Sequence, residues 1–164
     1  MKFAQLSILL VALVIALISA VEAGKRKPRG PSQTIRFGRK LKGKSTWFNG
    51  HDLKGASCYG NLMGNSNVNA KDDWHIAAVK MSHYKGGLRS ACFECARITN
   101  GKRSIVVRII DECAGCAPNQ IDLTASAFKA LAPLSQGVVH TTYEFIKCPS
   151  RGLKWPKSPR AKSH

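Results

Sequence analysis

Residues 104–132, which read SIVVRIIDECAGCAPNQIDLTASAFKALA, decide the fold because they place a strand, a cysteine-bracketed loop and a helix start in succession. The β-branched run Ile105–Ile110 predicts a strand, and Leu123–Ala132 has the pattern of a short helix. Two aspartates, Asp111 and Asp122, stand at the two edges of the loop. We therefore expect both carboxylates at the rim of a rigid scaffold, which is where proteins place binding and catalytic groups.

The remaining elements are short and mostly extended. The dipeptide Asn100–Gly101 supplies the positive φ angles of a tight hairpin turn between two alternating strands. Further extended segments are expected at 46–49, 75–81 and 138–147, with a polar loop over 58–70 and one helix that Thr124 caps and Pro133 ends. Many short strands, one small helix and no βαβ rhythm predict a compact all-β barrel or sandwich.

The N-terminal segment MKFAQLSILLVALVIALISAVEA, residues 1–23, has the basic start, apolar run and small-residue end of a secretory signal peptide. A signal anchor is the alternative, but the charge-free run Leu6–Val21 is short for a span of about 20 residues. We expect cleavage after Ala23 and no stable membrane span. The remaining length suits one domain with a modest core.

The formal net charge of +17 belongs to the two ends of the chain. Residues 24–44 carry nine Lys or Arg and residues 147–164 carry six, whereas residues 45–146 carry ten basic and eight acidic residues. We expect a basic disordered arm at 24–44, a folded domain at 45–148 and a basic disordered tail at 149–164.

These basic ends either tether the protein to a polyanion, such as an acidic polysaccharide, or serve only as solubilising or processed segments. A nucleic-acid partner is disfavoured, because the ends lack interleaved aromatic residues and the chain carries a secretory signal.

Six cysteines lie outside the signal segment, and an even number in a small secreted chain predicts three disulfides. The competing interpretation is a zinc site, since the two CxxC pairs at 92–95 and 113–116 have zinc-ribbon spacing. Zinc is disfavoured because the secretory route is oxidising and because Cys58 and Cys148 would be left over. The five histidines show no metal-ligand spacing, so we expect no metal and no cofactor.

Three stretches resemble the barrel of expansins and expansin-like (RlpA-like) proteins, above all the single-domain microbial and fungal type. They are STWFNGHDLKGASCYGNL from Ser45, the long run from His75 to Ala132, and GVVHTTYEFIKC, which ends at Cys148. The resemblance implies an all-β fold, a six-stranded double-psi β-barrel with one or two short helices and disulfide braces. The pairs it implies are Cys58–Cys92 and Cys95–Cys148, with Cys113–Cys116 left over, and an exchanged pairing stays open.

By the same resemblance, three polar residues line a shallow polysaccharide groove: Thr46, Asp111 and Asp122. The family's aromatic groove position is Cys113 here, which departs from the simple bacterial pattern. Four other aromatic residues are candidates for sugar stacking, although we expect core burial for at least two of them: Trp47, Phe48, Tyr59 and Trp74. We expect no second, carbohydrate-binding domain after Cys148, so affinity for a glycan must come from the groove, from the basic ends or from Trp155, or be weak.

Hydrolysis of a glycosidic bond with inversion needs a proton donor and a second carboxylate that activates water. Asp122 fits the donor. The position at which related barrel endoglucanases carry the base holds Asn49–Gly50, and the nearby Asp52 is more typical of a solvated loop carboxylate.

The leading hypothesis is therefore a secreted, monomeric expansin-like protein that binds and loosens cell-wall polysaccharide without net hydrolysis. Asp122 would be the essential group, and Thr46 and Asp111 would position the glycan. One alternative is a lytic transglycosylase or endoglucanase on the same barrel that acts through Asp122. The other is a non-catalytic secreted inhibitor or defence protein.

Overall fold

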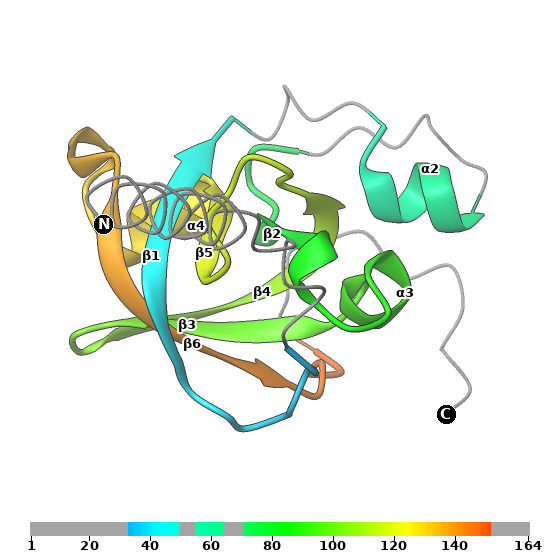
Figure 1. Ribbon diagram of the computed structural model, residues 1–164. Coiled ribbons are helices and arrows are strands. Elements are labelled where there is room, and N and C mark those ends of the chain that lie inside the picture. Colours follow the sequence, from blue (N-terminus) through cyan, green and yellow to red (C-terminus); the bar gives the residue numbers. More distant parts are fainter. Residues whose placement is uncertain (1–32, 50–54, 64–70, 152–164) are drawn as a thin grey trace, which may run out of the picture. The chain divides into compact units, whose positions relative to one another are not determined.

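The computed structural model describes residues 33–49, 55–63 and 71–151. The predicted signal peptide, the first part of the arm, Asp52 and the end of the tail lie outside these ranges. Six strands close into a barrel in the order β1-β5-β2-β4-β3-β6 (Figure 1). Their bounds are β1 Leu41–Phe48, β2 Ile76–Val79, β3 Cys95–Asn100, β4 Arg103–Glu112, β5 Gln120–Thr124 and β6 Val139–Ile146. The barrel confirms the predicted fold class.

Side chains fill the barrel by the two-residue alternation of its strands. In β6, Val139, Thr141, Tyr143 and Phe145 are buried, and the residues between them are more exposed. Successive side chains of a strand point to opposite faces, so one set lines the interior and the other faces outward. A second, smaller cluster packs Ala56 and Tyr59 against Ile76 of β2 and Ile110 of β4.

Short helices connect the strands: α2 Ser57–Met63, α3 Leu88–Ala91, α4 Ala125–Leu131 and the 3₁₀ helices η2 Met81–His83 and η3 Leu134–Gln136. The prediction of a polar loop over 58–70 is wrong at its start, because α2 begins there and buries Cys58 and Tyr59. The described part of the chain has no helix that is both long enough and apolar enough to cross a membrane.

Two strand boundaries differ from the sequence-based ones. Strand β1 begins at Leu41, so the barrel starts within the stretch that the sequence assigned to a disordered arm. Lys42 and Lys44 are exposed and give residues 41–44 the basic composition of the arm, whereas Leu41 and Gly43 between them are partly buried. Strand β2 is shorter than the predicted 75–81 segment, since it ends at Val79 and η2 follows.

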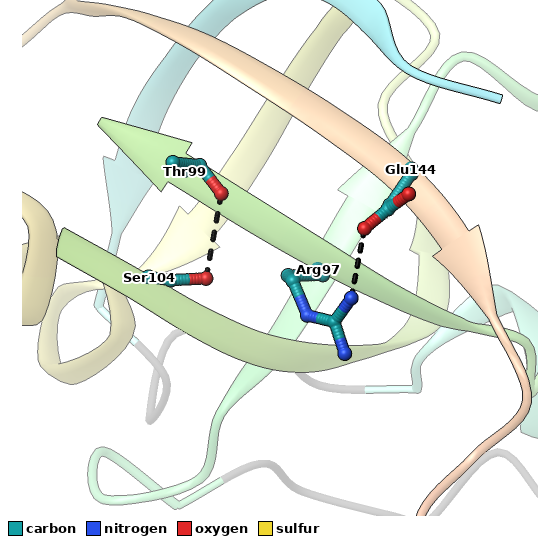
Figure 2. A network of polar contacts seen from close by, with 4 residues as sticks. All are labelled: Arg97, Thr99, Ser104 and Glu144. Atoms are coloured by element: carbon teal, nitrogen blue, oxygen red, sulfur yellow. Dashed lines mark hydrogen bonds and ion pairs between the residues drawn. The ribbon is translucent and has the colours of Figure 1, made fainter. Parts of the chain in front are cut away.

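The predicted hairpin is present, with its turn shifted by one residue. Asn100 of β3 pairs with Arg103 of β4, so the two turn residues are Gly101 and Lys102, and Gly101 has a φ of 58°. Figure 2 shows how polar contacts cross this wall: Thr99 and Ser104 face each other at 3.4 Å. In the same view, Arg97 of β3 forms a salt bridge of 2.8 Å with Glu144 of β6.

All three predicted disulfides are present. Cys58–Cys92 joins α2 to the residue after α3, Cys95–Cys148 ties β3 to the segment after β6, and Cys113–Cys116 closes the loop after β4. Because every cysteine is paired, none is a thiolate that could bind zinc, and the zinc-ribbon alternative is wrong.

Helix α4 is anchored at its start by Thr124. This residue occupies the predicted N-cap position, but its side chain makes no capping hydrogen bond and instead donates to the carbonyl oxygen of Trp74 at 2.5 Å. The helix buries Phe128 and Leu131 in the core and ends before Pro133, as predicted.

Candidate functional site

A row of paired residues crosses the barrel wall over strands β1, β5, β2 and β4. Thr46 pairs with Asp122, Asp122 pairs with Ala78, and Ala78 pairs with Asp111. Directly paired residues project to the same face of a sheet, and both neighbours of Asp122 along β5 are buried in the core. The three polar residues predicted from the sequence therefore lie on one outward face.

Asp122 is the partly buried centre of this row. Thr46 Oγ1 donates to Asp122 Oδ1 at 2.6 Å, and Gln120 Nε2 donates to Thr46 Oγ1 at 3.1 Å. Burial raises the pKa of the Asp122 carboxyl above its ordinary value, and the hydrogen bond from Thr46 opposes that shift. Desolvation therefore outweighs the hydrogen bond and disfavours the anion of this carboxyl.

Asp111 has a different task from Asp122. Its Oδ1 accepts the backbone N–H of Ser57 at 2.8 Å, so the carboxylate satisfies one of the free donors at the start of α2. One strand, β2, lies between the two aspartates, and its pairing with β4 shifts in register between Ala77 and Ala78. Sequence reasoning missed this contact because Ser57 and Asp111 are far apart along the chain.

A hollow of about 370 Å³ adjoins the row along β1. Lys44 of β1 pairs with Gln120 of β5 and with His140 of β6. Lys44 lies two residues before Thr46 on β1, so the hollow adjoins the polar row on the same face of the sheet. Its lining residues are Lys42, Gly43, Lys44, Ala117, Asn119, Gln120 and His140. Two of these described lining residues are lysines and none is acidic, so the formal charge of the lining is positive. Sequence reasoning assigned these lysines to a disordered arm and missed the site.

The four aromatic candidates occupy different environments. Tyr59 is 3% exposed and its ring meets Phe93 edge-on at 5.2 Å. Trp74 packs against the same small cluster. Trp47 packs against the main core, and its indole N–H donates to the carbonyl oxygen of Leu134 at 3.1 Å.

Phe48 is the aromatic candidate that shares the outward face of the polar row. It is half-buried and lies two residues after Thr46 on β1. The other three aromatic candidates pack against the two hydrophobic clusters. Phe48 is therefore the candidate best placed to stack against a sugar that contacts Asp122.

Within the described ranges, no group of three His, Cys, Asp or Glu side chains has the arrangement of a metal site.

A family model and a known protein are both similar to most of this chain. The model of a double-psi β-barrel family described as lytic transglycolase matches residues 40–143. The chain is similar to the papain inhibitor of Streptomyces mobaraensis, with 30% identity over 135 residues that cover 80% of this chain and 90% of the inhibitor.

Two solved structures are also similar. The Streptomyces papain inhibitor has a TM-score of 0.55 and 25% identity, over 69% of this chain and 99% of that one. A mutant expansin of Clavibacter michiganensis in complex with cellohexaose has a TM-score of 0.55 and 22% identity, over 70% of this chain and 54% of that one. The second likeness concerns the fold alone.

Proposed function

Because the chain belongs to the lytic transglycolase family of double-psi β-barrels, we propose that it uses this barrel for binding, as a secreted inhibitor of papain-type cysteine proteases. The observation that carries the proposal is the similarity to the papain inhibitor, which extends through 80% of this chain and 90% of that protein. The match is longer than the stretch 40–143 that the family model covers. Secretion is supported by the three disulfides, which are typical of small extracellular domains.

The polar row supports binding more than bond cleavage. An inverting glycosidase needs two carboxyl groups that face the same glycosidic bond and water. Here Asp111 Oδ1 is engaged by the N–H of Ser57 at the start of α2, which favours a structural role for this carboxylate over the activation of water. Asp122 and the hydroxyl of Thr46 then remain as the ligand-binding pair of the row, which suits recognition.

The construction of the barrel also suits an inhibitor. The sheet is closed, two disulfides tie segments that are far apart in the sequence, and the third closes the loop after β4. Protease inhibitors gain affinity when their contact surface is ordered before binding, because less conformational entropy is lost in the complex.

The test is inhibition of papain by the purified protein with its disulfides intact, after the reductant used to activate papain has been removed. We expect inhibition that persists at high salt, because a complex made by the folded domain is screened much less than one made by the basic ends. A serine protease provides the control for non-specific effects. Absence of both inhibition and binding of papain would overturn the proposal.

A second candidate function is glycan binding at the groove, which the Thr46–Asp122 pair and the adjoining hollow favour. The pair offers a hydrogen-bonding group beside the half-buried ring of Phe48, a combination that suits a sugar. Lys42, Lys44 and His140 on the hollow favour a glycan that carries carboxylate or sulfate groups. In this form the protein would bind and loosen cell-wall polysaccharide, as an extracellular, wall-associated protein.

Pull-down with neutral and acidic polysaccharides tests this second function. We expect retention on an acidic glycan and a marked loss of retention for Lys44→Gln, with Lys102→Gln at the hairpin as the matched control. New reducing or anhydro ends in the glycan would instead indicate a lytic enzyme that acts through Asp122. Equal retention of both variants would exclude the hollow as the site.

A further inference from the structure

The loop between β4 and β5, residues 113–119, lies directly before Gln120 and Asp122 in the sequence, and we call it the braced loop. The Cys113–Cys116 disulfide closes its first half. Four of its residues are exposed and small or rigid, without charge: Ala114, Gly115, Ala117 and Pro118. The loop therefore presents small, uncharged side chains at the surface.

Hydrogen bonds hold this loop along its length. Cys113 donates its N–H to the carbonyl oxygen of Val79 at 2.9 Å, and Cys116 donates back to Cys113 at 3.1 Å. Gln120 bonds twice to Ala117: its N–H donates to the Ala117 carbonyl at 3.0 Å, and its Oε1 accepts the Ala117 N–H at 3.2 Å.

The far end of the loop is fixed against β1. Asn119 accepts the N–H of Lys44 on its carbonyl oxygen at 3.4 Å and the side-chain amide of Gln33 on its Oδ1 at 3.2 Å. Gly43 lies so close beneath that a Cβ there would stand 1.8 Å from the Asn119 carbonyl oxygen. The loop thus combines exposure with a fixed backbone, whereas most exposed loops are mobile.

A protease cleft is shaped to receive a narrow peptide segment, and an inhibitor must offer such a segment without being consumed. A disulfide-closed loop meets both needs, because its backbone is ordered in advance and its two ends stay joined. Resting on the proposed inhibitory function, we propose that residues 113–119 form the surface that enters the active-site cleft of a papain-type cysteine protease.

Gly115 allows a clean steric test. It has no positive φ, and nothing lies within 4 Å of a Cβ built on it, so Gly115→Trp can be introduced without disturbing the fold. We expect this variant to unfold at the wild-type temperature and to inhibit papain roughly 30-fold or more weakly, the size of an interface hot spot. The matched control is Lys102→Trp, at the opposite end of β4 and roughly 30 Å away along that ten-residue strand; it should inhibit like the wild type.

The outcomes separate the two proposals. If the wild type inhibits papain and Gly115→Trp inhibits equally well, the braced loop is not the contact surface, while the inhibitory function stands. If the wild type neither inhibits nor binds papain, the inhibitory function itself fails.

A second measurement needs no variant. Papain whose catalytic cysteine carries a bulky peptidyl group should lose binding to the wild-type protein, because the blocked cleft cannot admit the loop. Unchanged binding to blocked papain would overturn the loop assignment.

Discussion

Replacement of Asp111 by alanine distinguishes two roles for this carboxylate. One is structural, at the start of α2, and the other is the glycan positioning that the family resemblance implies. The change removes the acceptor of the Ser57 N–H at the start of α2. Loss of an N-cap acceptor costs about 1 kcal/mol, and a hydrogen bond to a charged group is worth about 1.5–3 kcal/mol. The Cys58–Cys92 disulfide holds the helix one residue further on, which limits the damage to local fraying. We therefore expect a loss of about 1–2 kcal/mol.

For a domain of this size, that loss corresponds to a fall in Tm of roughly 5–10 °C. Asp111→Asn keeps an acceptor of similar capping strength and should change stability by less than about 0.5 kcal/mol. Thermal unfolding of both variants, together with papain inhibition and glycan retention, measures the two roles separately. Both variants should inhibit and bind like the wild type below their Tm. A tenfold loss of either activity at an unchanged Tm would refute the structural assignment and return Asp111 to the groove.

Three further changes test the fold and the site. Burial raises the pKa of Asp122 above its ordinary value of 3.8, so the native state binds this proton more tightly than the unfolded state does. The free energy of unfolding therefore falls as the pH rises from below 3.8 through the raised pKa of the native state. Asp122→Asn should raise the Tm at pH 7 more than at low pH, and an equal rise at both pH values would contradict the raised pKa. Gly43→Ala places a Cβ against the Asn119 carbonyl oxygen and should lower the free energy of unfolding, measured in urea, by about 3 kcal/mol or more. Unchanged stability would show that the braced loop can move away from β1. Removal of the Cys58–Cys92 disulfide with two alanines, across a separation of 34 residues, should cost about 3.8 kcal/mol from chain entropy, and a loss below about 1 kcal/mol would contradict that account.

Local sequence patterns predicted the parts of this fold that depend on neighbouring residues. The alternation in β6, the hairpin at Gly101 and the end of α4 before Pro133 all follow from short-range geometry. The disulfide pairs came from the family resemblance, since six cysteines alone allow many pairings.

The features that the sequence did not reveal depend on contacts between distant segments. Helix α2 is short and contains a glycine, and its start is held by Asp111 across the fold. The lysines of β1 have the composition of a solvated arm, and only pairing with β5 and β6 turns Lys44 into the wall of a hollow. Composition cannot distinguish an exposed strand face from a disordered end when both are basic.

The braced loop and the Asp122 carboxyl belong to one series of hydrogen bonds, so the two proposed binding functions involve the same rim of the barrel. Gln120 contacts Ala117 of the loop through its Oε1 and Thr46 through its Nε2, and Thr46 in turn donates to Asp122. The side-chain amide of Gln120 accepts through its oxygen and donates through its nitrogen. The hydrogen bonds therefore all point the same way, from the N–H of Ala117 to the carboxyl of Asp122. A ligand that engages Asp122 therefore acts on the same side chain that holds the loop, and a partner that engages the loop acts on the groove.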